Sequence, residues 1–89
     1  MTKVVWKYPV PLGPSLSFKM PRGAEVLDVA RQHGDVQLWA LVDPGEEMET
    51  RTFMWLGTGH VTDVPVTRHA GTIMVDDGAF VFHLFEVPA

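Results

Sequence analysis

Residues 73–82, with the sequence Ile-Met-Val-Asp-Asp-Gly-Ala-Phe-Val-Phe, carry the clearest structural signal in the chain. The Asp-Gly pair at positions 77–78 readily takes the positive φ angles that a type I′ turn requires, and strand-forming residues flank it. The stretch therefore predicts a β-hairpin in which Val75 faces Phe80. The same register pairs Ile73 with Phe82, Gly71 with Leu84, Met74 with Val81, and Thr72 with His83. Both faces are largely apolar, so we expect one to meet the core and the other a second layer or another subunit.

A second hairpin is expected upstream, around His33-Gly34. By propensity alone, residues 24–33 suit either a short amphipathic helix or a strand. Pairing across the His-Gly turn favours the strand, because it builds one continuous apolar face. The expected pairs on that face are Val29 with Leu38, Leu27 with Ala40, and Arg31 with Val36. The opposite face then carries Asp28 against Trp39 and Ala30 against Gln37.

Three further segments show strand patterns. Residues 4–10 are β-branched and aromatic, and residues 15–20 and 50–56 alternate between the two faces of a strand. Turn residues separate the segments, as in the acidic turn at 43–47. The sum is six to eight short strands, which predicts one all-β domain over residues 1–89, a small antiparallel β-sandwich or barrel. The edges of so small a sheet must be covered, twisted or paired, so we expect a homo-oligomer.

Composition narrows the class of protein. The 89 residues include no cysteine, which removes disulfides and thiolate chemistry and fits a cytosolic protein. We expect no membrane segment and no signal peptide, because the apolar runs are short. The net charge of −4 disfavours direct binding to DNA or RNA. Residues 1–24 hold four bases and no acid, whereas residues 25–89 hold eleven acids and three bases, so a local anion site near the N-terminus and a simple internal charge pairing both stay open.

No catalytic site, metal site or cofactor is expected from the motifs. The chain has no arrangement typical of a nucleophilic triad, and its adjacent carboxylates fall in exposed turns. His60, His69 and His83 lack the close spacing of metal ligands, although a hydrolase built on them is a minor alternative. In the predicted register His69 lies opposite Glu86, which suggests a cross-strand ion pair or hydrogen bond, and His83 bonds to Thr72.

A small set of residues suits a nucleotide-sized ligand. Trp39 and Trp55 can stack on a base, and Trp39 is the one expected to point outward. Arg51, Arg68 or Lys7 can pair with phosphate. The glycine-rich turn can present backbone N–H groups to an anion; its residues are Gly57, Thr58, Gly59 and His60. Competing interpretations are that the tryptophans fill the core and that the turn only reverses the chain.

Seven short segments together resemble a family of small uncharacterised proteins encoded mainly by bacteriophages. They are residues 6–9 (Trp-Lys-Tyr-Pro), 21–24 (Pro-Arg-Gly-Ala), 38–44 (Leu-Trp-Ala-Leu-Val-Asp-Pro), 50–53 (Thr-Arg-Thr-Phe), 57–60 (Gly-Thr-Gly-His), 69–72 (His-Ala-Gly-Thr) and 80–86 (Phe-Val-Phe-His-Leu-Phe-Glu). The resemblance spans nearly the whole chain and depends on the order of the segments. It implies a phage gene product that works in the host bacterial cytoplasm, and it carries no catalytic residues.

These observations lead to one expected function and two alternatives. We expect a non-enzymatic, oligomeric binding protein that antagonises bacterial host defence by sequestering a nucleotide signal. The first alternative is a protein–protein inhibitor of a host defence effector, comparable to an anti-CRISPR protein, which uses an exposed sheet face or edge. The second is an accessory protein of the virion.

Overall fold

Seven β-strands make up the regular structure of the computed structural model, which describes residues 2–88. They are β1 (Val4–Pro9), β2 (Leu16–Pro21), β3 (Glu25–Gln32), β4 (Asp35–Val42), β5 (Met48–Gly57), β6 (Arg68–Val75) and β7 (Phe80–Val87). The all-β prediction is confirmed, and the segment 24–33 contains the strand Glu25–Gln32 and not a helix. Among the described residues there is no helix with the length and apolar character to cross a membrane.

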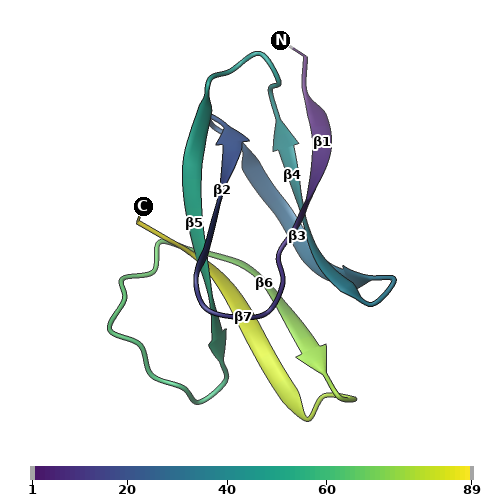
Figure 1. Ribbon diagram of the computed structural model, residues 1–89, viewed down its shortest axis with the longest axis vertical. Helices are drawn as coiled ribbons and strands as arrows, with labels where there is room; N and C mark the ends of the chain where they lie inside the picture. The colour runs from purple at the N-terminus through teal and green to yellow at the C-terminus, as the bar shows by residue number, and fades with distance from the viewer. Residues whose placement is uncertain (1, 89) are drawn as a thin grey trace.

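The strands form two antiparallel sheets (Figure 1). Sheet A has the order β1-β4-β3, and sheet B has the order β2-β5-β7-β6. They form separate hydrogen-bonded units, so the described chain is a two-sheet structure and not a closed barrel. Strands β3 and β6, at one edge of each sheet, pack against each other, which covers both of those edges.

The core lies between the two sheets and is filled by side chains from both. Its largest fully buried members are Phe53, Met20, Leu38 and Leu84. A row of stacked rings connects the sheets, because Tyr8 of β1 lies 5.1 Å from Phe18 of β2, and Phe18 lies 5.2 Å from Phe53 of β5. Each stacked pair at this separation stabilises the fold by about 1 kcal/mol beyond the effect of burying the two rings.

Both predicted hairpins form, and most of their register is confirmed. Val75 pairs with Phe80 across a turn in which Asp77 and Gly78 have φ angles of 54° and 89°. The other four pairs expected across that hairpin are also present. In the upstream hairpin His33 and Gly34 also have positive φ, and Val29 pairs with Leu38 as expected.

Two β-bulges make part of the predicted register wrong. In β3 the register shifts between Val26 and Asp28, so Val26 and not Leu27 faces Ala40, and Leu27 is 48% exposed. In β6 it shifts between His69 and Gly71, so His69 faces Phe85 and not Glu86. One extra residue turns every side chain beyond it to the other face of the strand, which period-two reasoning does not anticipate.

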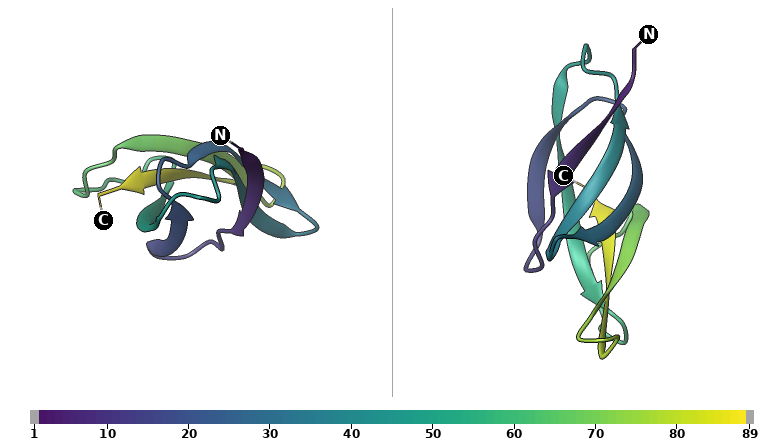
Figure 2. Two further views of the ribbon diagram at one scale, coloured as in Figure 1. Left: turned by 90° about the horizontal axis from the view of Figure 1, so that it is seen from above. Right: turned by 90° about the vertical axis from the view of Figure 1, so that its right-hand side faces the viewer.

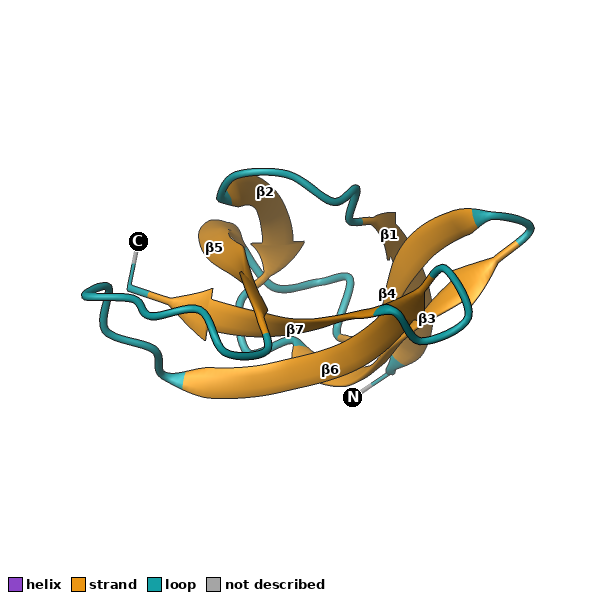
Figure 3. Cartoon of the chain, turned by 90° about the horizontal axis from the view of Figure 1, so that it is seen from below, coloured by secondary structure: helices purple, strands orange, loops and turns teal. Residues whose placement is uncertain are grey.

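The second bulge lies at a close contact between the two sheets. A Cβ atom on Gly71 would lie 2.6 Å from Cβ of Val29, so no larger residue fits between β6 and β3 without movement. Beyond this contact, the lower ends of β5, β6 and β7 extend past sheet A (Figure 2). Residues 58–67 connect β5 to β6 as a long loop without a strand or helix (Figure 3). Sheet B therefore has one end that is covered and one that is not.

Candidate functional site

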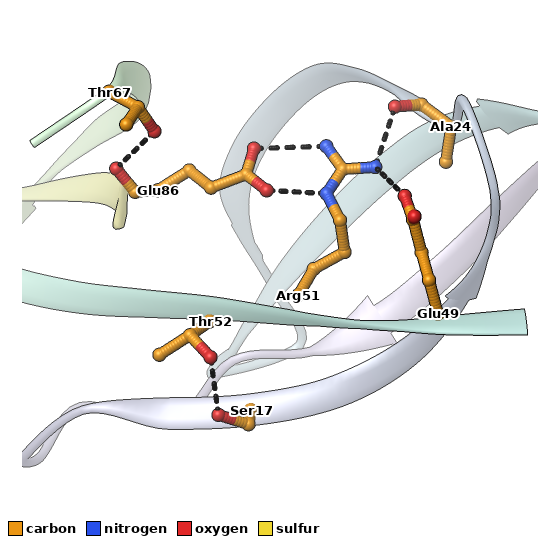
Figure 4. Close-up of polar contacts among 7 residues, drawn as sticks. All are labelled: Ser17, Ala24, Glu49, Arg51, Thr52, Thr67 and Glu86. Atoms are coloured by element: carbon orange, nitrogen blue, oxygen red, sulfur yellow. Dashed lines mark hydrogen bonds and ion pairs between the residues drawn. The ribbon is translucent and has the colours of Figure 1, made fainter. Parts of the chain in front are cut away.

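The covered end of sheet B holds a polar network centred on Arg51 of β5 (Figure 4). Its Nε and Nη2 donate to the two carboxylate oxygens of Glu86 on β7, the second over 2.9 Å. Nη1 donates to the carbonyl oxygen of Ala24 over 3.0 Å and lies 3.9 Å from Glu49 Oε1. We call these four residues the arginine clamp. It joins the chain entering β3 to two strands of the other sheet.

Burial makes the arginine clamp a structural element. The side chains of Arg51 and Glu86 are only 12% and 16% exposed. The hydrogen bonds with Glu86 raise the pKa of Arg51 above its ordinary value, although desolvation acts in the opposite direction, so the guanidinium stays charged. Each of the three nitrogens of Arg51 donates to the protein, so Glu86 and Ala24 hold the guanidinium in place.

A groove of about 790 Å³ opens beside the clamp and brings two of the predicted phosphate-binding residues together. Arg51 and Arg68 both line it, with Glu25 and Glu86 supplying negative charge. Arg68 is exposed and forms no ion pair with any carboxylate in the described chain. The groove thus balances its charges and has little positive potential to attract an anion.

Tyr8 completes the interior at this end. Its hydroxyl is shielded from solvent and has no hydrogen-bond partner among residues 2–88. Burial raises the pKa of Tyr8, and the nearby charge of Arg51 partly offsets that rise. The ring stacks on Phe18, whereas the hydroxyl forms no hydrogen bond within the described part of the chain.

The uncovered end of sheet B has a hollow of about 320 Å³, which we call the aromatic hollow. Its lining includes three of the predicted ligand residues and two phenylalanines; in full it is Gly57, Thr58, His60, Ala79, Phe80, Val81 and Phe82. The ring of His60 rests on Gly57, where an added Cβ would lie 2.8 Å from Nδ1. Phe80 is 54% exposed, although its neighbour Phe82 packs against the core.

Two backbone amides of the glycine-rich turn form hydrogen bonds within the protein. The amide of His60 donates to the carbonyl of Gly57, and the amide of Thr58 donates to the carbonyl of Val81, both over 3.0 Å. These two donors are therefore not available to an anion. No lysine or arginine lines the hollow. The exposed residues Asp76 and Asp77 belong to the hairpin turn that ends at Ala79, so the surroundings are acidic.

The two tryptophans of the predicted ligand set lie in other places. Trp39 is partly exposed on the outer face of sheet A, where the register puts it between Lys7 and Asp28. Lys7 Nζ donates to Gln32 on the far side of β4 over 2.9 Å, so its side chain crosses this face. Trp55 packs against the core and donates from Nε1 to the carbonyl of Pro11 over 3.0 Å. The eight predicted residues are thus divided among four places.

A chain of hydroxyl and imidazole groups crosses the outer face of sheet B. Thr58 Oγ1 lies 2.7 Å from His83 Nε2, His83 Nδ1 lies 2.9 Å from Thr72 Oγ1, and Thr72 Oγ1 lies 3.0 Å from His69 Nε2. The predicted bond between His83 and Thr72 is confirmed. The place of His69 was missed because the bulge before Gly71 was not foreseen.

Sequence reasoning also missed the importance of Phe80 and the pairing of Arg51 with Glu86. The hairpin register placed Phe80 on the inner face, but its exposure depends on how far sheet A extends.

Two-sheet antiparallel β-proteins with surface hollows are a broad structural class. Within it, this chain belongs to the family described as a domain of unknown function, DUF7352, whose model matches residues 1–89. No match was found among curated proteins or among solved structures.

Proposed function

We propose that this chain is a non-enzymatic binding protein that blocks a partner protein with the uncovered end of sheet B. The observation that carries the proposal is the aromatic hollow with its exposed rim. Phe80 lines the hollow and is 54% exposed, whereas Met74, 61% exposed, pairs with Val81 on the same hairpin. Exposed aromatic side chains that line a concave site are typical of the anchor regions of protein interfaces.

The charge around the hollow favours one kind of partner. Asp76 and Asp77 lie in the turn beside it, and its lining contains no lysine or arginine. The net charge of the chain is −4. A protein with a basic surface and a protruding apolar or aromatic side chain complements this end in both shape and charge.

The same charge supports a protein partner over a nucleotide. A nucleotide needs donors or cations for its phosphate, yet Arg51 is committed to Glu86 and two amides of the glycine-rich turn are bonded internally. In the phage setting that the sequence resemblance implies, the partner is an effector of bacterial host defence. Blocking that effector protects the phage.

The test is a counter-defence assay with matched surface variants. The chain is expressed in bacteria that carry individual defence systems, and plaque counts of a sensitive phage are measured. Once a system is inhibited, Phe80→Asp should abolish both the protection and co-elution of the chain with the purified effector. Leu27→Asp is the matched control, because Leu27 is 48% exposed on the other sheet and should keep both activities.

Three outcomes would overturn the proposal. One is that Phe80→Asp folds and inhibits as well as the original chain. Another is that native mass spectrometry of the active protein shows a retained nucleotide and no effector, which would support sequestration. A second copy of the chain covering Phe80 in a stable dimer would likewise argue against an effector at this surface.

A further inference from the structure

We infer that His69 and His83, with the hydroxyl of Thr72, form a binding site for a borderline divalent transition-metal ion such as Zn²⁺ on the outer face of sheet B. None of these three residues lines the aromatic hollow, and the inference does not depend on the proposed function. Two imidazole nitrogens, Nε2 of His69 and Nδ1 of His83, converge on the same oxygen, Thr72 Oγ1, from 3.0 and 2.9 Å. The ring centroids are 6.3 Å apart.

The β6 bulge creates this arrangement. Without it, His69 would lie on the inner face of the sheet, opposite Glu86. With it, His69 pairs with Phe85 while Thr72 pairs with His83, so all of these side chains share the outer face. The ring of His69 also lies against that of Phe85, with centroids 5.4 Å apart, which limits its orientations.

The hydrogen bond on the other side of His83 prepares its Nδ1 as a ligand. A metal-binding imidazole needs one unprotonated nitrogen, and its second nitrogen usually donates to a neighbouring oxygen. Nε2 of His83 lies 2.7 Å from Thr58 Oγ1, which can accept that proton. The Nδ1 lone pair is then directed toward Thr72 and His69. Thr58 thereby acts as a positioning residue for this site.

Imidazole ligands select for Zn²⁺, Ni²⁺ and Cu²⁺ over Mg²⁺ or Ca²⁺. Zinc–nitrogen bonds are about 2.1 Å long, so the two nitrogens must come within about 4 Å of each other. His69 is exposed, so its ring has room to move toward His83. Within residues 2–88 no third His, Cys, Asp or Glu joins the group. The Thr72 hydroxyl and water would therefore supply the other positions, and we expect binding weaker than at a closed structural site.

The experiment is calorimetric titration of the full chain with ZnCl₂, compared across single variants. His69→Ala should weaken binding at least tenfold, and His83→Ala should do the same. His33→Ala is the matched control, because His33 is an exposed histidine in the β3–β4 turn and should leave the affinity unchanged. Thr58→Val, which cannot accept from Nε2, should weaken binding less than loss of either imidazole.

A second measurement uses the unaltered chain and does not depend on the folding of any variant. In the unaltered chain, substoichiometric Ni²⁺ should broaden the imidazole NMR signals of His69 and His83 before those of His33 and His60. Equal broadening of all four histidines would overturn the inference. So would a His33→Ala variant that loses as much affinity as His69→Ala.

Discussion

The inner face of sheet B ends in two contrasting ways. At one end Arg51 and Glu86 carry full charges yet are largely buried, and their polar atoms bond to each other and to Ala24. At the other end Phe80 is apolar yet 54% exposed, and it borders a hollow. A buried charge that is fully paired contributes to structure, whereas an exposed apolar group gains free energy only when something covers it. The contrast assigns stability to the first end and binding to the second.

The strongest way to break this contrast is to remove the arginine of the clamp. Arg51→Leu leaves Glu86 partly buried without its partner, so we expect a loss of about 2–3 kcal/mol in the free energy of unfolding, measured by urea denaturation. The double variant Arg51→Leu/Glu86→Leu should recover most of that loss. Arg22→Leu is the control, because its ion pair is exposed and should cost less than about 1 kcal/mol. Equal losses for Arg51→Leu and Arg22→Leu would contradict the structural role of the clamp.

The contact between β3 and β6 offers the next largest effect. Gly71→Ala places a methyl group 2.6 Å from Cβ of Val29, so the two sheets must separate locally. We expect a loss of about 2 kcal/mol in the free energy of unfolding. A thermal midpoint equal to that of the original chain would show that β6 does not lie this close to β3.

The uncovered end should tolerate a change that the core does not. Phe80→Ala removes a ring that is more than half exposed, so we expect the free energy of unfolding to fall by less than about 1 kcal/mol. Phe53→Ala, which truncates a fully buried ring, should cost about 3–5 kcal/mol in the same measurement. Comparable losses for Phe80→Ala and Phe53→Ala would mean that Phe80 belongs to the core and is not available to bind a partner.

The smallest effect expected at neutral pH comes from Tyr8. Its hydroxyl has no partner among the described residues, so Tyr8→Phe should leave the free energy of unfolding unchanged or raise it by about 1 kcal/mol. The pKa of Tyr8 is raised above its ordinary value of 10.0, mainly by burial. Its protonated form therefore contributes stability below pH 10 that is lost as pH rises through the folded-state pKa. Denaturation at pH 7 and pH 11 should show a smaller alkaline loss for Tyr8→Phe, and a variant that loses stability at pH 7 would reveal a hidden bond.

Much of the fold could be predicted from local signals. The Asp77-Gly78 and His33-Gly34 turns specify both hairpins, because few residues other than these accept positive φ without strain. The bulges could not be predicted, since no turn residue or break in the apolar pattern marks them in the sequence. The β6 bulge lies beside the contact of Gly71 with Val29, and these residues are distant in the sequence.

The candidate site was harder to predict than the strands. Residue types alone suggested that Arg51 is free for phosphate, whereas the register brings Glu86 beside it. Trp39 was correctly placed on an outer face, yet it lies on the other sheet from Trp55. Which residues share a site depends on the order of the strands in each sheet and on the relative lengths of the sheets. Neither property can be predicted from a single segment of the sequence.

The most direct test of the contrast between the two ends is hydrogen exchange of the chain alone and in complex with the effector found by the counter-defence assay. We predict that binding slows exchange of amides at Gly59 and Ala79, around the aromatic hollow. Amides near Ala24 and Arg51 should exchange equally slowly in both states. Protection that appears at Ala24 and Arg51 and not at the hollow would contradict the assignment of binding to the uncovered end of sheet B.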